Sequence, residues 1–324
     1  MTMSDNLIDI RHLKKYFNVS SGLLHAVDDV SLTIPRGKTL GLVGESGCGK
    51  STLGRVIIGL IKETAGEVFF NGEDATKFSG EKRAEFRRHA QIVFQDPFSS
   101  LNPRMSVSQL ISEPLIINKS CKSKAELDAK VAELMDLVGL ASRLTTSFPH
   151  ELDGGRRQRI GIARALALNP EFIVLDEPVS ALDVCIQAQV LNLLADLRES
   201  RGYTYLFISH NLSVVRYVSD EVAVMYLGKV VEKADNSTLF RQPLHPYTQA
   251  LLSAVPIASV GPKKQRIILE GDVPSPVNPP AGCRFAGRCM YRQEICTQQT
   301  PELVEVEPNH FVACHCTGHL VRHA

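Results

Sequence analysis

Residues 44–51 carry glycines, a lysine and a serine at a spacing suited to holding phosphate, since the stretch GESGCGKS fits G-x-x-x-x-G-K-S. It follows an apolar run, TLGLV, and precedes a helical pattern over 51–61, which is the context that this motif requires. The glycines let successive backbone N–H groups turn towards phosphate oxygens, and the helix N-terminus adds its positive dipole end. We expect Lys50 to reach the β- and γ-phosphates and the Ser51 hydroxyl to bind Mg²⁺. The alternative is a chance glycine-rich turn.

A second stretch, FIVLDEP, ends in two adjacent carboxylates, Asp176 and Glu177. The apolar run before them predicts a strand, with Asp176 at its carboxyl end beside the phosphate loop, where it can hold Mg²⁺ through the water shell. Glu177 points to the opposite side, and a carboxylate there can orient and deprotonate an attacking water. The alternative is that DEP only begins a turn.

A third stretch, ELDGGRRQR at 151–159, has a glycine pair, Gly154 and Gly155, at the start of a predicted helix. Paired glycines at a helix start let backbone amides approach an anion. Asp153, directly before the pair, carries a negative charge of its own. The stretch therefore raises the question of why such a site should repel its ligand.

The elements that must position these residues follow from the hydrophobic pattern. Alternating residues over 6–40 predict short antiparallel strands, and GEVFFNGED predicts a strand that meets an Asn71-Gly72 turn. Continuous apolar runs in EFIVLDEP and TYLFISH, and a further apolar strand from Ile92 to Gln95, are typical of parallel strands covered on both faces. VCIQAQVLNLLADLRES predicts a helix between two of these strands, and DEVAVMYLGKVVEKA predicts a hairpin.

Residues 97–165 break the alternation of strands and helices. Leu127, Val131, Leu134 and Val138 share one face of a predicted helix, and the segment as a whole predicts an α-helical insert. Residues 256–282 hold six prolines and predict an extended segment, and a short Cys-rich tail follows. The fold class is therefore α/β, with an antiparallel β subdomain, a helical insert and a small C-terminal extension.

Composition limits the function. The formal net charge of +1 gives no electrostatic footprint for binding nucleic acid, and 44% hydrophobic residues is ordinary for a globular protein. The first ten residues lack the basic and apolar regions of a secretory signal, and no run of 18 apolar residues is long enough to span a bilayer. We expect a cytosolic chain that reaches a membrane through partners.

The phosphate loop, ELDGG, VLDEP, SALD and FISH occur in the order that resembles the ATP-binding subunit of ABC transporters, a P-loop NTPase, across roughly residues 6–255. The resemblance implies that Tyr16 stacks on adenine, with Phe17 as its rival, and that His210 contacts the γ-phosphate. It also implies that Gln95 touches Mg²⁺ and the attacking water. Asn211 replaces the aspartate usual after the histidine, which removes a charge.

The resemblance implies a composite site in which the catalytic residues are Glu177, His210 and Gln95, and Ser180 to Asp183 cross a dimer interface. Mg²⁺ would be held through Ser51, Gln95 and Asp176. The implied nucleotide-binding residues are Tyr16, Gly44, Glu45, Ser46, Gly47, Cys48, Gly49, Lys50, Ser51, Thr52 and Asp176.

Three further stretches, HPYTQALLSAVP, VPSPVNPPAGCRFAGRC and QDPFSSLNPRMSV, resemble the oligopeptide/dipeptide importer subfamily. This implies an ATP-binding domain over 1–255 and a subfamily extension over 256–324. The implied partners are a second ABC ATPase chain, usually a different one, two transmembrane permease subunits and an extracytoplasmic solute-binding protein. The implied place is the cytoplasmic face of the cell membrane, with ATP and Mg²⁺ as cofactors.

Three alternatives stay open at this stage. The same machinery imports nickel chelates or other small solutes, because specificity lies in the binding protein and the membrane subunits. A largely non-catalytic regulatory subunit would explain an altered signature. A soluble ABC-type ATPase of DNA repair or translation would need a long coiled coil or two fused ATPase domains, and the sequence shows neither.

In this family the glycine pair belongs to the signature LSGGQ, which completes the ATP site of the partner chain. Here the signature is altered, with aspartate for serine and arginine for glutamine: Leu152, Asp153, Gly154, Gly155 and Arg156. In one interpretation Asp153 is a helix N-cap and ATP chemistry changes little. In the other, which we favour, a carboxylate about 5 Å from a phosphate charge costs roughly 3 kcal/mol at an effective dielectric constant near 20, about a hundredfold in binding. Arg156 offsets part of this cost if it turns towards the phosphate.

Five of the eight cysteines crowd into 283–316. Cys283, Cys289, Cys296 and Cys314 do not have the paired spacing of a zinc ribbon, but four thiolates suit an iron–sulfur cluster. The spacing resembles that of peptide-importer ATPases with a [4Fe–4S] cluster, so we expect one here, with reduced thiols or a zinc site as the alternatives.

Overall fold

The computed structural model describes residues 6–255 and 266–317. These form two compact units. The phosphate-loop unit comprises Ile8–Ile34, Thr39–Thr76 and residues 209–317, and the signature unit comprises residues 6–7, Pro35–Lys38 and Lys77–Ile208. Each unit is described by itself. Part of the predicted extended segment, 256–265, lies outside the described residues.

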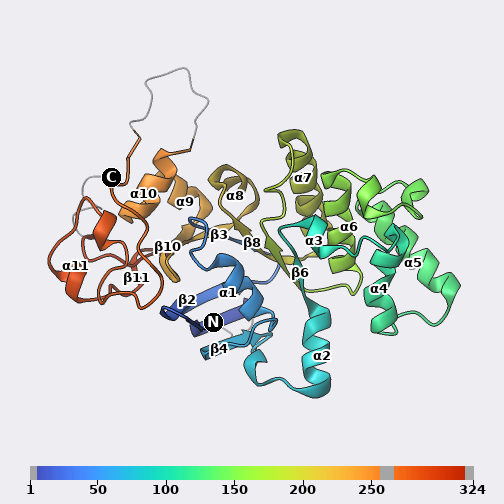
Figure 1. The fold of residues 1–324 in the computed structure, drawn as a ribbon, viewed down its shortest axis with the longest axis horizontal. Helices are drawn as coiled ribbons and strands as arrows, with labels where there is room; N and C mark the ends of the chain where they lie inside the picture. Colours follow the sequence, from blue (N-terminus) through green and yellow to red (C-terminus); the bar gives the residue numbers. More distant parts are fainter. Residues whose placement is uncertain (1–5, 256–265, 318–324) are drawn as a thin grey trace. The chain divides into compact units, whose positions relative to one another are not determined.

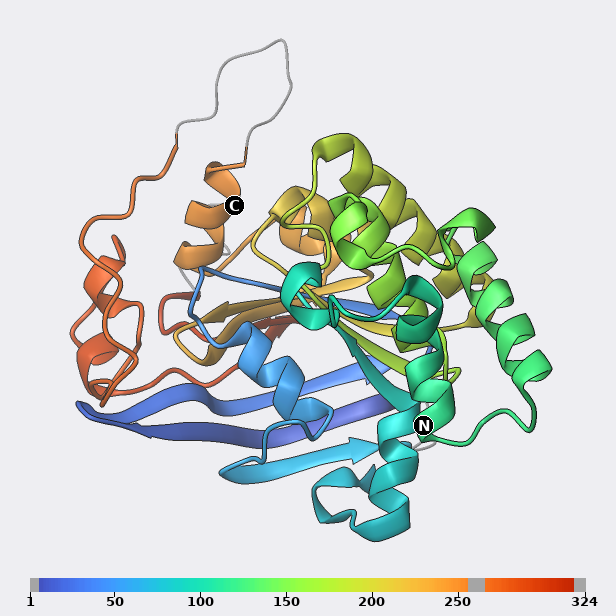
Figure 2. The same ribbon diagram turned by 45° about the vertical axis from the view of Figure 1, so that its right-hand side comes forward.

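An antiparallel sheet in the phosphate-loop unit is formed in the order β2-β1-β4-β5. Its strands are β1 (Asn6–Val19), β2 (Gly22–Pro35), β4 (Ala65–Phe70) and β5 (Glu73–Asp74), seen in blue in Figure 2. Ile8 on β1 lies opposite Phe70 on β4. The buried side chains of β1 are Leu7, Ile8, Ile10 and Leu13, so the predicted alternation holds only in part. The turn between β4 and β5 is the predicted Asn71-Gly72 pair, with φ of 51° and 79°.

The second group of strands in this unit holds the phosphate loop. β3 (Thr39–Val43) is buried at all five residues and pairs in parallel with β9 (Glu221–Tyr226). β9 forms the predicted hairpin with β10 (Lys229–Asp235), and the sheet continues through β12 (His310–Val312) to β11 (Val304–Glu307). The sequence did not predict β11 or β12, so the tail is joined to this unit by backbone hydrogen bonds that the apolar pattern did not reveal.

Helices complete the phosphate-loop unit. α1 (Lys50–Ile57) is shorter than the predicted 51–61 helix, because its C-cap is Ile58. The other helical elements follow in chain order: η1 (Ala75–Lys77, where the two units meet in sequence), α8 (Leu212–Val218), α9 (Asn236–Arg241), α10 (Pro246–Ser253), η4 (Ala286–Arg288) and α11 (Ile295–Gln298).

A buried carboxylate joins three segments of this unit. Glu232 on β10 has no exposed surface and accepts hydrogen bonds from the backbone N–H groups of Leu244 and His245, at 2.7 and 2.9 Å. Its third partner is Nε2 of His310 on β12, at 2.7 Å, and His310 is also fully buried. A charge buried in protein requires such partners, so β10, the start of α10 and β12 depend on one another.

The signature unit is built on three parallel strands. β7 (Phe172–Asp176) pairs with β6 (Ala90–Val93) on one side and β8 (Thr204–Ser209) on the other, and β7 and β8 are buried throughout. The prediction of a strand from Ile92 to Gln95 was wrong at both ends, since β6 begins at Ala90 and ends at Val93. It ends early because Phe94 is exposed and Asp96 caps the next helix. α2 (Gly80–His89) precedes β6, and α7 (Val184–Arg201) lies between β7 and β8 in sequence, as predicted.

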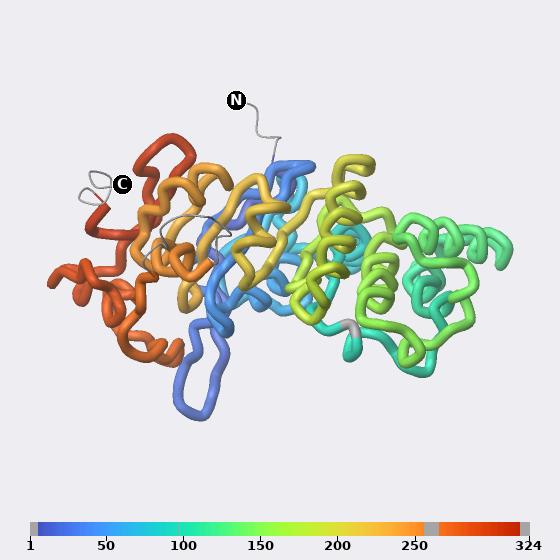
Figure 3. The backbone as a smooth tube through the Cα atoms, turned by 90° about the horizontal axis from the view of Figure 1, so that it is seen from above, coloured from blue at the N-terminus to red at the C-terminus, as the bar shows by residue number. Residues whose placement is uncertain are grey.

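Four helices and two 3-10 turns occupy residues 97–166, and their ribbons pack against one another in Figures 1 and 3. They are α3 (Pro97–Ser100), α4 (Val107–Ile117), α5 (Lys124–Leu137), η2 (Ser142–Leu144), η3 (Pro149–Glu151) and α6 (Gly154–Leu166). Side-chain caps explain where two of them begin: Ser106 forms a capping box with Gln109, and Ser123 caps α5. Among residues 6–255 and 266–317, no helix is long and apolar enough to cross a membrane.

Candidate functional site

The phosphate loop runs from the end of β3 to the start of α1 and has one closed and one open side. At Gly49, φ is +105° and a Cβ would lie 1.9 Å from the carbonyl oxygen of Ala26, so only glycine fits. At Gly47, φ is +78° and a Cβ would meet nothing within 4 Å. The loop therefore packs against backbone at Gly49 and presents open space at Gly47, where an anion can approach the amides.

Lys50 and the start of α1 provide the charge for this site. The Lys50 side chain is buried, and Nζ donates to the carbonyl oxygens of Gly44 and Glu45 at 2.8 and 2.9 Å. The N-cap of α1 is Gly49, which has no side chain to compete with an anion for the first amides. The buried ammonium, the amides and the neighbouring Ser51 hydroxyl fit a triphosphate with Mg²⁺.

Cys48 lies in the loop as predicted, with its sulfur turned inwards. Its side chain is buried, its carbonyl oxygen accepts from the N–H of Gly228 at 2.8 Å, and burial raises the pKa of its thiol. The thiol is therefore a packing group rather than a nucleophile.

The two carboxylates and the glutamine are brought together in the signature unit. Asp176 ends β7 and is fully buried, and Glu177 follows with φ of +49°. Nε2 of Gln95 donates to Oε2 of Glu177 at 3.0 Å, and the N–H of Glu177 donates to the carbonyl oxygen of Ile208 at 2.9 Å. A glutamate held at positive φ is a strained residue, which is typical of functional sites.

Asp153 caps α6. Its Oδ1 accepts from the backbone N–H of Arg156 at 2.8 Å, and Oδ2 lies 3.2 Å from Nη1 of the same arginine. The carboxylate therefore occupies one helix amide itself and draws the Arg156 guanidinium towards it. Leu152 is buried, and a Cβ at Gly155 would lie 2.5 Å from Cγ2 of Ile186, so the helix start packs closely against α7.

The segment after Glu177 connects these parts. Ser180 Oγ donates to the carbonyl oxygen of Glu177 at 3.1 Å, and Asp183 directly precedes α7. A Cβ at Gly154 would lie 3.1 Å from Cδ2 of Leu182. Residues 180–183 thus lie between the carboxylate pair and the start of α6.

His210 follows β8 and is exposed, in the phosphate-loop unit, whereas Glu177 belongs to the signature unit. The Asn211 side-chain oxygen accepts from the N–H groups of Ser213 and Val214 at 3.0 and 3.4 Å and so caps α8. The replacement of aspartate by Asn211 therefore keeps the local fold.

Tyr16 on β1 has one partner for its ring and one for its hydroxyl. The ring stacks on His25 with centroids 4.1 Å apart, and the hydroxyl donates to Asp28. Phe17, the alternative residue for stacking on adenine, makes a cation–π contact, with Lys15 Nζ 4.8 Å from its ring centroid.

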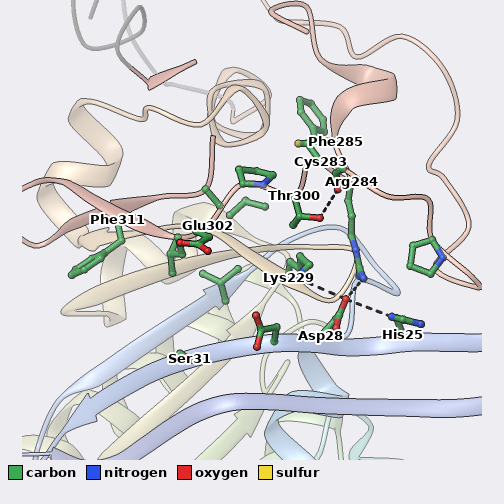
Figure 4. A pocket seen from close by; sticks show the side chains of 18 of the residues that line it. His25, Asp28, Ser31, Lys229, Cys283, Arg284, Phe285, Thr300, Glu302 and Phe311 are labelled. Carbon is green, nitrogen blue, oxygen red and sulfur yellow. Dashed lines mark hydrogen bonds and ion pairs between the residues drawn. The ribbon is translucent and has the colours of Figure 1, made fainter. Parts of the chain in front are cut away.

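Asp28 joins Tyr16 to the C-terminal segment. The Arg284 guanidinium pairs with Asp28, and Lys229 Nζ lies 3.9 Å from Oδ2 of Asp28 (Figure 4). Burial opposes the Asp28 charge, but the Tyr16 hydroxyl and the two cations outweigh it and lower the pKa of Asp28. No sequence motif marks this pairing, because Arg284 lies 256 residues after Asp28.

A cavity of about 840 Å³ opens beside this ion pair (Figure 4). Its walls come from β2, from the β10 strand and from residues 279–285 and 300–303, and Asp28, Lys229 and Glu302 give it mixed charge. The cavity therefore selects neither anions nor cations by charge alone.

The predicted iron–sulfur site is not supported. Among the residues that the structure describes, no group of three or more His, Cys, Asp or Glu side chains is arranged to hold a metal ion. The Cys316 thiol donates to the carbonyl oxygen of Tyr291, and the Cys314 sulfur accepts from the Cys316 N–H. Burial raises the pKa of Cys289 to about 11 and that of Cys314 to about 12, and both, like Cys283 and Cys296, are free cysteines.

Two family models match the chain. The model described as "ABC transporter" matches residues 27–180, and the model described as "Oligopeptide/dipeptide transporter, C-terminal region" matches residues 231–296. The second match runs from within β10 through α10 to the first three cysteines of the tail.

Curated relatives resemble the chain over nearly its whole length. The oligopeptide transport ATP-binding protein AppF of Bacillus subtilis is 52% identical over 321 residues, covering 96% of this chain and 97% of the relative. OppF of the same organism is 50% identical over 96% and 97% of the two chains. A putative peptide import ATP-binding protein of Brucella ovis is 48% identical over 95% and 97%.

Solved structures give the same fold. A dimeric ATP-binding cassette in a post-hydrolysis state, bound to ADP and phosphate, matches with a TM-score of 0.65 and 28% identity over 71% of this chain and 98% of that one. CbiO1 of Clostridium perfringens, part of an ABC transporter complex, matches with a TM-score of 0.65 and 27% identity over 73% and 91%. The fold is thus that of an ABC-type P-loop ATPase, and the chain belongs to the family of ATP-binding subunits of ABC transporters, in the group with the oligopeptide/dipeptide transporter C-terminal region.

Proposed function

We propose that this chain is the ATP-hydrolysing subunit that powers the import of dipeptides and oligopeptides through a membrane ABC transporter. The observation that carries the proposal is the phosphate loop: the Lys50 ammonium is buried against the loop carbonyls, α1 begins without a side-chain cap, and a Cβ at Gly47 would meet nothing within 4 Å. The peptide substrate is inferred from the relatives, whose names describe oligopeptide transport and peptide import.

Each residue of the site has its own role in phosphoryl transfer to water. Lys50 and the loop amides would hold the triphosphate. Ser51, Asp176 and Gln95, the residues that the family resemblance implies, would hold Mg²⁺, which would supply positive charge against the developing negative charge. Glu177, oriented by Gln95 at 3.0 Å, takes the proton of the attacking water, and His210 donates to the γ-phosphate. Tyr16 stacks on adenine with the ring face that His25 does not cover.

The proposed assembly has a second ABC ATPase chain, two transmembrane permease subunits and an extracytoplasmic solute-binding protein. In it the chain lies peripherally on the cytoplasmic face of the membrane, with residues 1–255 as the ATP-binding domain and 256–324 as the extension. ATP bound across the two ATPase chains shifts the population towards the closed dimer, and loss of the γ-phosphate removes that bias. The helices of 97–165 carry the surface that grips the permeases.

The two ATP sites of this assembly differ in strength. The site on this chain's own phosphate loop is complete when the partner supplies a normal signature. The site that uses Asp153 and Arg156 is weakened by the carboxylate, because the exposed side chain of Asp153 keeps a negative charge at the helix end. The Arg156 guanidinium offsets part of that charge.

The test is Glu177→Gln in the complex co-purified with its neighbouring subunits. We expect ATP hydrolysis and peptide uptake to fall at least about 100-fold while MgATP binding is retained, because only the general base is removed. Glu199→Gln, an exposed glutamate on α7, is the matched control and should hydrolyse like the parent. Equal turnover in the Glu177→Gln and parent complexes would instead support a non-catalytic regulatory subunit.

The transported substrate and the iron–sulfur cluster are each tested by a separate measurement. Uptake of labelled dipeptide and of a nickel chelate by reconstituted complex separates the peptide importer from its nickel alternative. The proposed function makes no use of an iron–sulfur cluster; iron analysis and the visible absorption of anaerobically purified protein test for one at Cys283, Cys289, Cys296 and Cys314.

A further inference from the structure

We propose that Tyr247 is a positioning residue for ATP binding, which holds the phosphate loop in its binding conformation through the backbone N–H of Glu45. In the sequence this tyrosine stands out only as part of HPYTQALLSAVP, about 200 residues after the loop. The proposal deepens the proposed function and rests on MgATP binding at the phosphate loop.

Glu45, the second residue of the loop, is held at three points. Its N–H donates to the Tyr247 hydroxyl at 2.9 Å, and its carbonyl oxygen accepts from Lys50 Nζ at 2.9 Å. Its carboxylate pairs with Nη1 of Arg288, 3.2 and 3.1 Å from the two oxygens. The N–H of Glu45 thus points to α10 rather than into the loop, which leaves the amides around Gly47 for phosphate.

Tyr247 itself has little freedom to move. It is fully buried, and its ring lies 4.6 Å from that of Tyr226 and 5.5 Å from that of Phe285, centroid to centroid. Two hydrogen bonds fix the start of α10, the helix that carries Tyr247. Glu232 accepts from the His245 N–H, and His245 Nδ1 accepts from the N–H of Tyr247 at 3.1 Å. The hydroxyl is therefore a fixed acceptor, and a fixed acceptor can fix the loop.

A loop held from behind loses less conformational freedom when it closes on a ligand, and this saving appears as affinity. The loop cannot provide this constraint by its own sequence, because Gly44, Gly47 and Gly49 all have positive φ and belong to a residue type with wide backbone freedom. The contacts from α10 and from Arg288 supply the constraint that the glycines lack. The geometry predicts an effect on ATP affinity and not on the chemical step, which belongs to Glu177.

The test is Tyr247→Phe in the full chain, with MgATP binding measured by calorimetry and hydrolysis measured in the assembled complex. Loss of one hydrogen bond to the loop should weaken MgATP binding and raise KM about 3- to 10-fold, with kcat at saturation unchanged. Tyr205→Phe is the matched control, because that buried hydroxyl likewise makes one hydrogen bond with backbone, although as the donor, to the Leu194 carbonyl oxygen at 3.2 Å. It should bind MgATP like the parent.

A second variant removes another contact of Glu45, the ion pair of its carboxylate with Arg288. Arg288→Met keeps the aliphatic stem but loses the pair with Glu45, and it should weaken MgATP binding about twofold, whereas Arg288→Lys should restore most of it. Because both variants act through Glu45, the double variant with Tyr247→Phe should weaken binding by less than the product of the two single effects.

The outcomes separate this inference from the proposed function. If the parent binds no MgATP, the proposed function itself fails. If the parent binds and Tyr247→Phe binds equally well, or if Tyr205→Phe is weakened as much, Tyr247 has no positioning role while the proposed function stands. A raised KM with normal kcat in Tyr247→Phe alone supports the inference.

Discussion

The chain contains two glycine-bearing loops that each lead into a helix, and the structure treats them in opposite ways. Before α1, Gly49 leaves the first amides without a side-chain cap, and the loop is held from outside by Tyr247, Arg288 and the Gly228 N–H. Before α6, Asp153 caps the helix with its own carboxylate and is paired with Arg156. One loop is kept open for an anion, and the other provides an anion itself.

The difference shows that a glycine pair at a helix start is not enough to define a phosphate site. What decides is whether the amides are already occupied and where the nearest formal charge lies. α1 begins with the buried Lys50 ammonium, whereas α6 is capped by the exposed Asp153 carboxylate. We therefore expect nucleotide binding at a glycine-bearing helix start to depend on the residue that caps it.

The largest expected effect comes from adding one methyl group to each loop. Gly49→Ala puts a Cβ 1.9 Å from the Ala26 carbonyl oxygen at φ of +105°, and should cost at least about 3 kcal/mol in the free energy of unfolding and abolish MgATP binding. Gly154→Ala meets only the flexible Leu182 side chain at 3.1 Å and should cost under about 1 kcal/mol. Urea unfolding and calorimetry measure both. Equal costs would break the comparison.

The next effect concerns acid, because α10, which supports the phosphate loop, is capped by a histidine. Burial lowers the pKa of His245 from 6.5 to about 4, although Glu232 opposes the shift. The unfolded chain then takes up a proton that the folded chain does not, so stability is lost as pH falls from 6.5 towards 4, by an amount on the order of 3 kcal/mol.

His245→Asn keeps an acceptor for the Tyr247 N–H and removes the titrating group, so this part of the pH dependence should disappear. His150→Asn, at an exposed position, is the control and should leave the dependence intact. The measurement is urea unfolding at several pH values between neutral and mildly acidic. A slope unchanged in His245→Asn would contradict the prediction.

A smaller effect tests the charge at α6. Asp153→Asn keeps an N-cap of similar quality but removes the charge, so the ATP site that uses this signature should bind about tenfold more tightly, after allowance for the offset by Arg156. Nucleotide occupancy per assembled complex, with Asp153→Ser measured in parallel, provides the evidence. Unchanged occupancy and turnover in both variants would leave only the N-cap role.

The smallest effect isolates that N-cap role. Asp153→Ala removes both the charge and the bond to the Arg156 N–H, and should destabilise the full chain by about 1 kcal/mol in urea unfolding. Asp153→Asn should not, so the pair of variants separates capping from charge. Equal stability of Asp153→Ala and the parent would mean that α6 needs no cap.

The local parts of the site could be predicted from sequence because they are encoded locally. The phosphate loop, the strand that ends at Asp176 and the N-cap interpretation of Asp153 each depend on residues within one short stretch, and the structure has them in those positions. The role of Gln95 came from the family resemblance alone, and its hydrogen bond to Glu177, 82 residues away, was not predicted.

The remaining parts depend on tertiary packing that no local pattern encodes. Arg284 reaches Asp28 and Tyr247 reaches Glu45 over 256 and 202 residues, and β12 joins β10 through only a few paired residues. For the cysteines the spacing along the chain did not settle the outcome. The thiols lie near enough to raise one another's pKa, but the described residues contain no group arranged to hold a metal ion.

Glu232 limits where this protein can be shortened. A polypeptide that stopped before His310 would leave the carboxylate buried without one of its three donors, and the two amides at the start of α10 would have to hold it alone. The C-terminal hairpin is thus a supporting part of the nucleotide-binding half, and fusion partners or affinity tags belong beyond it rather than in its place.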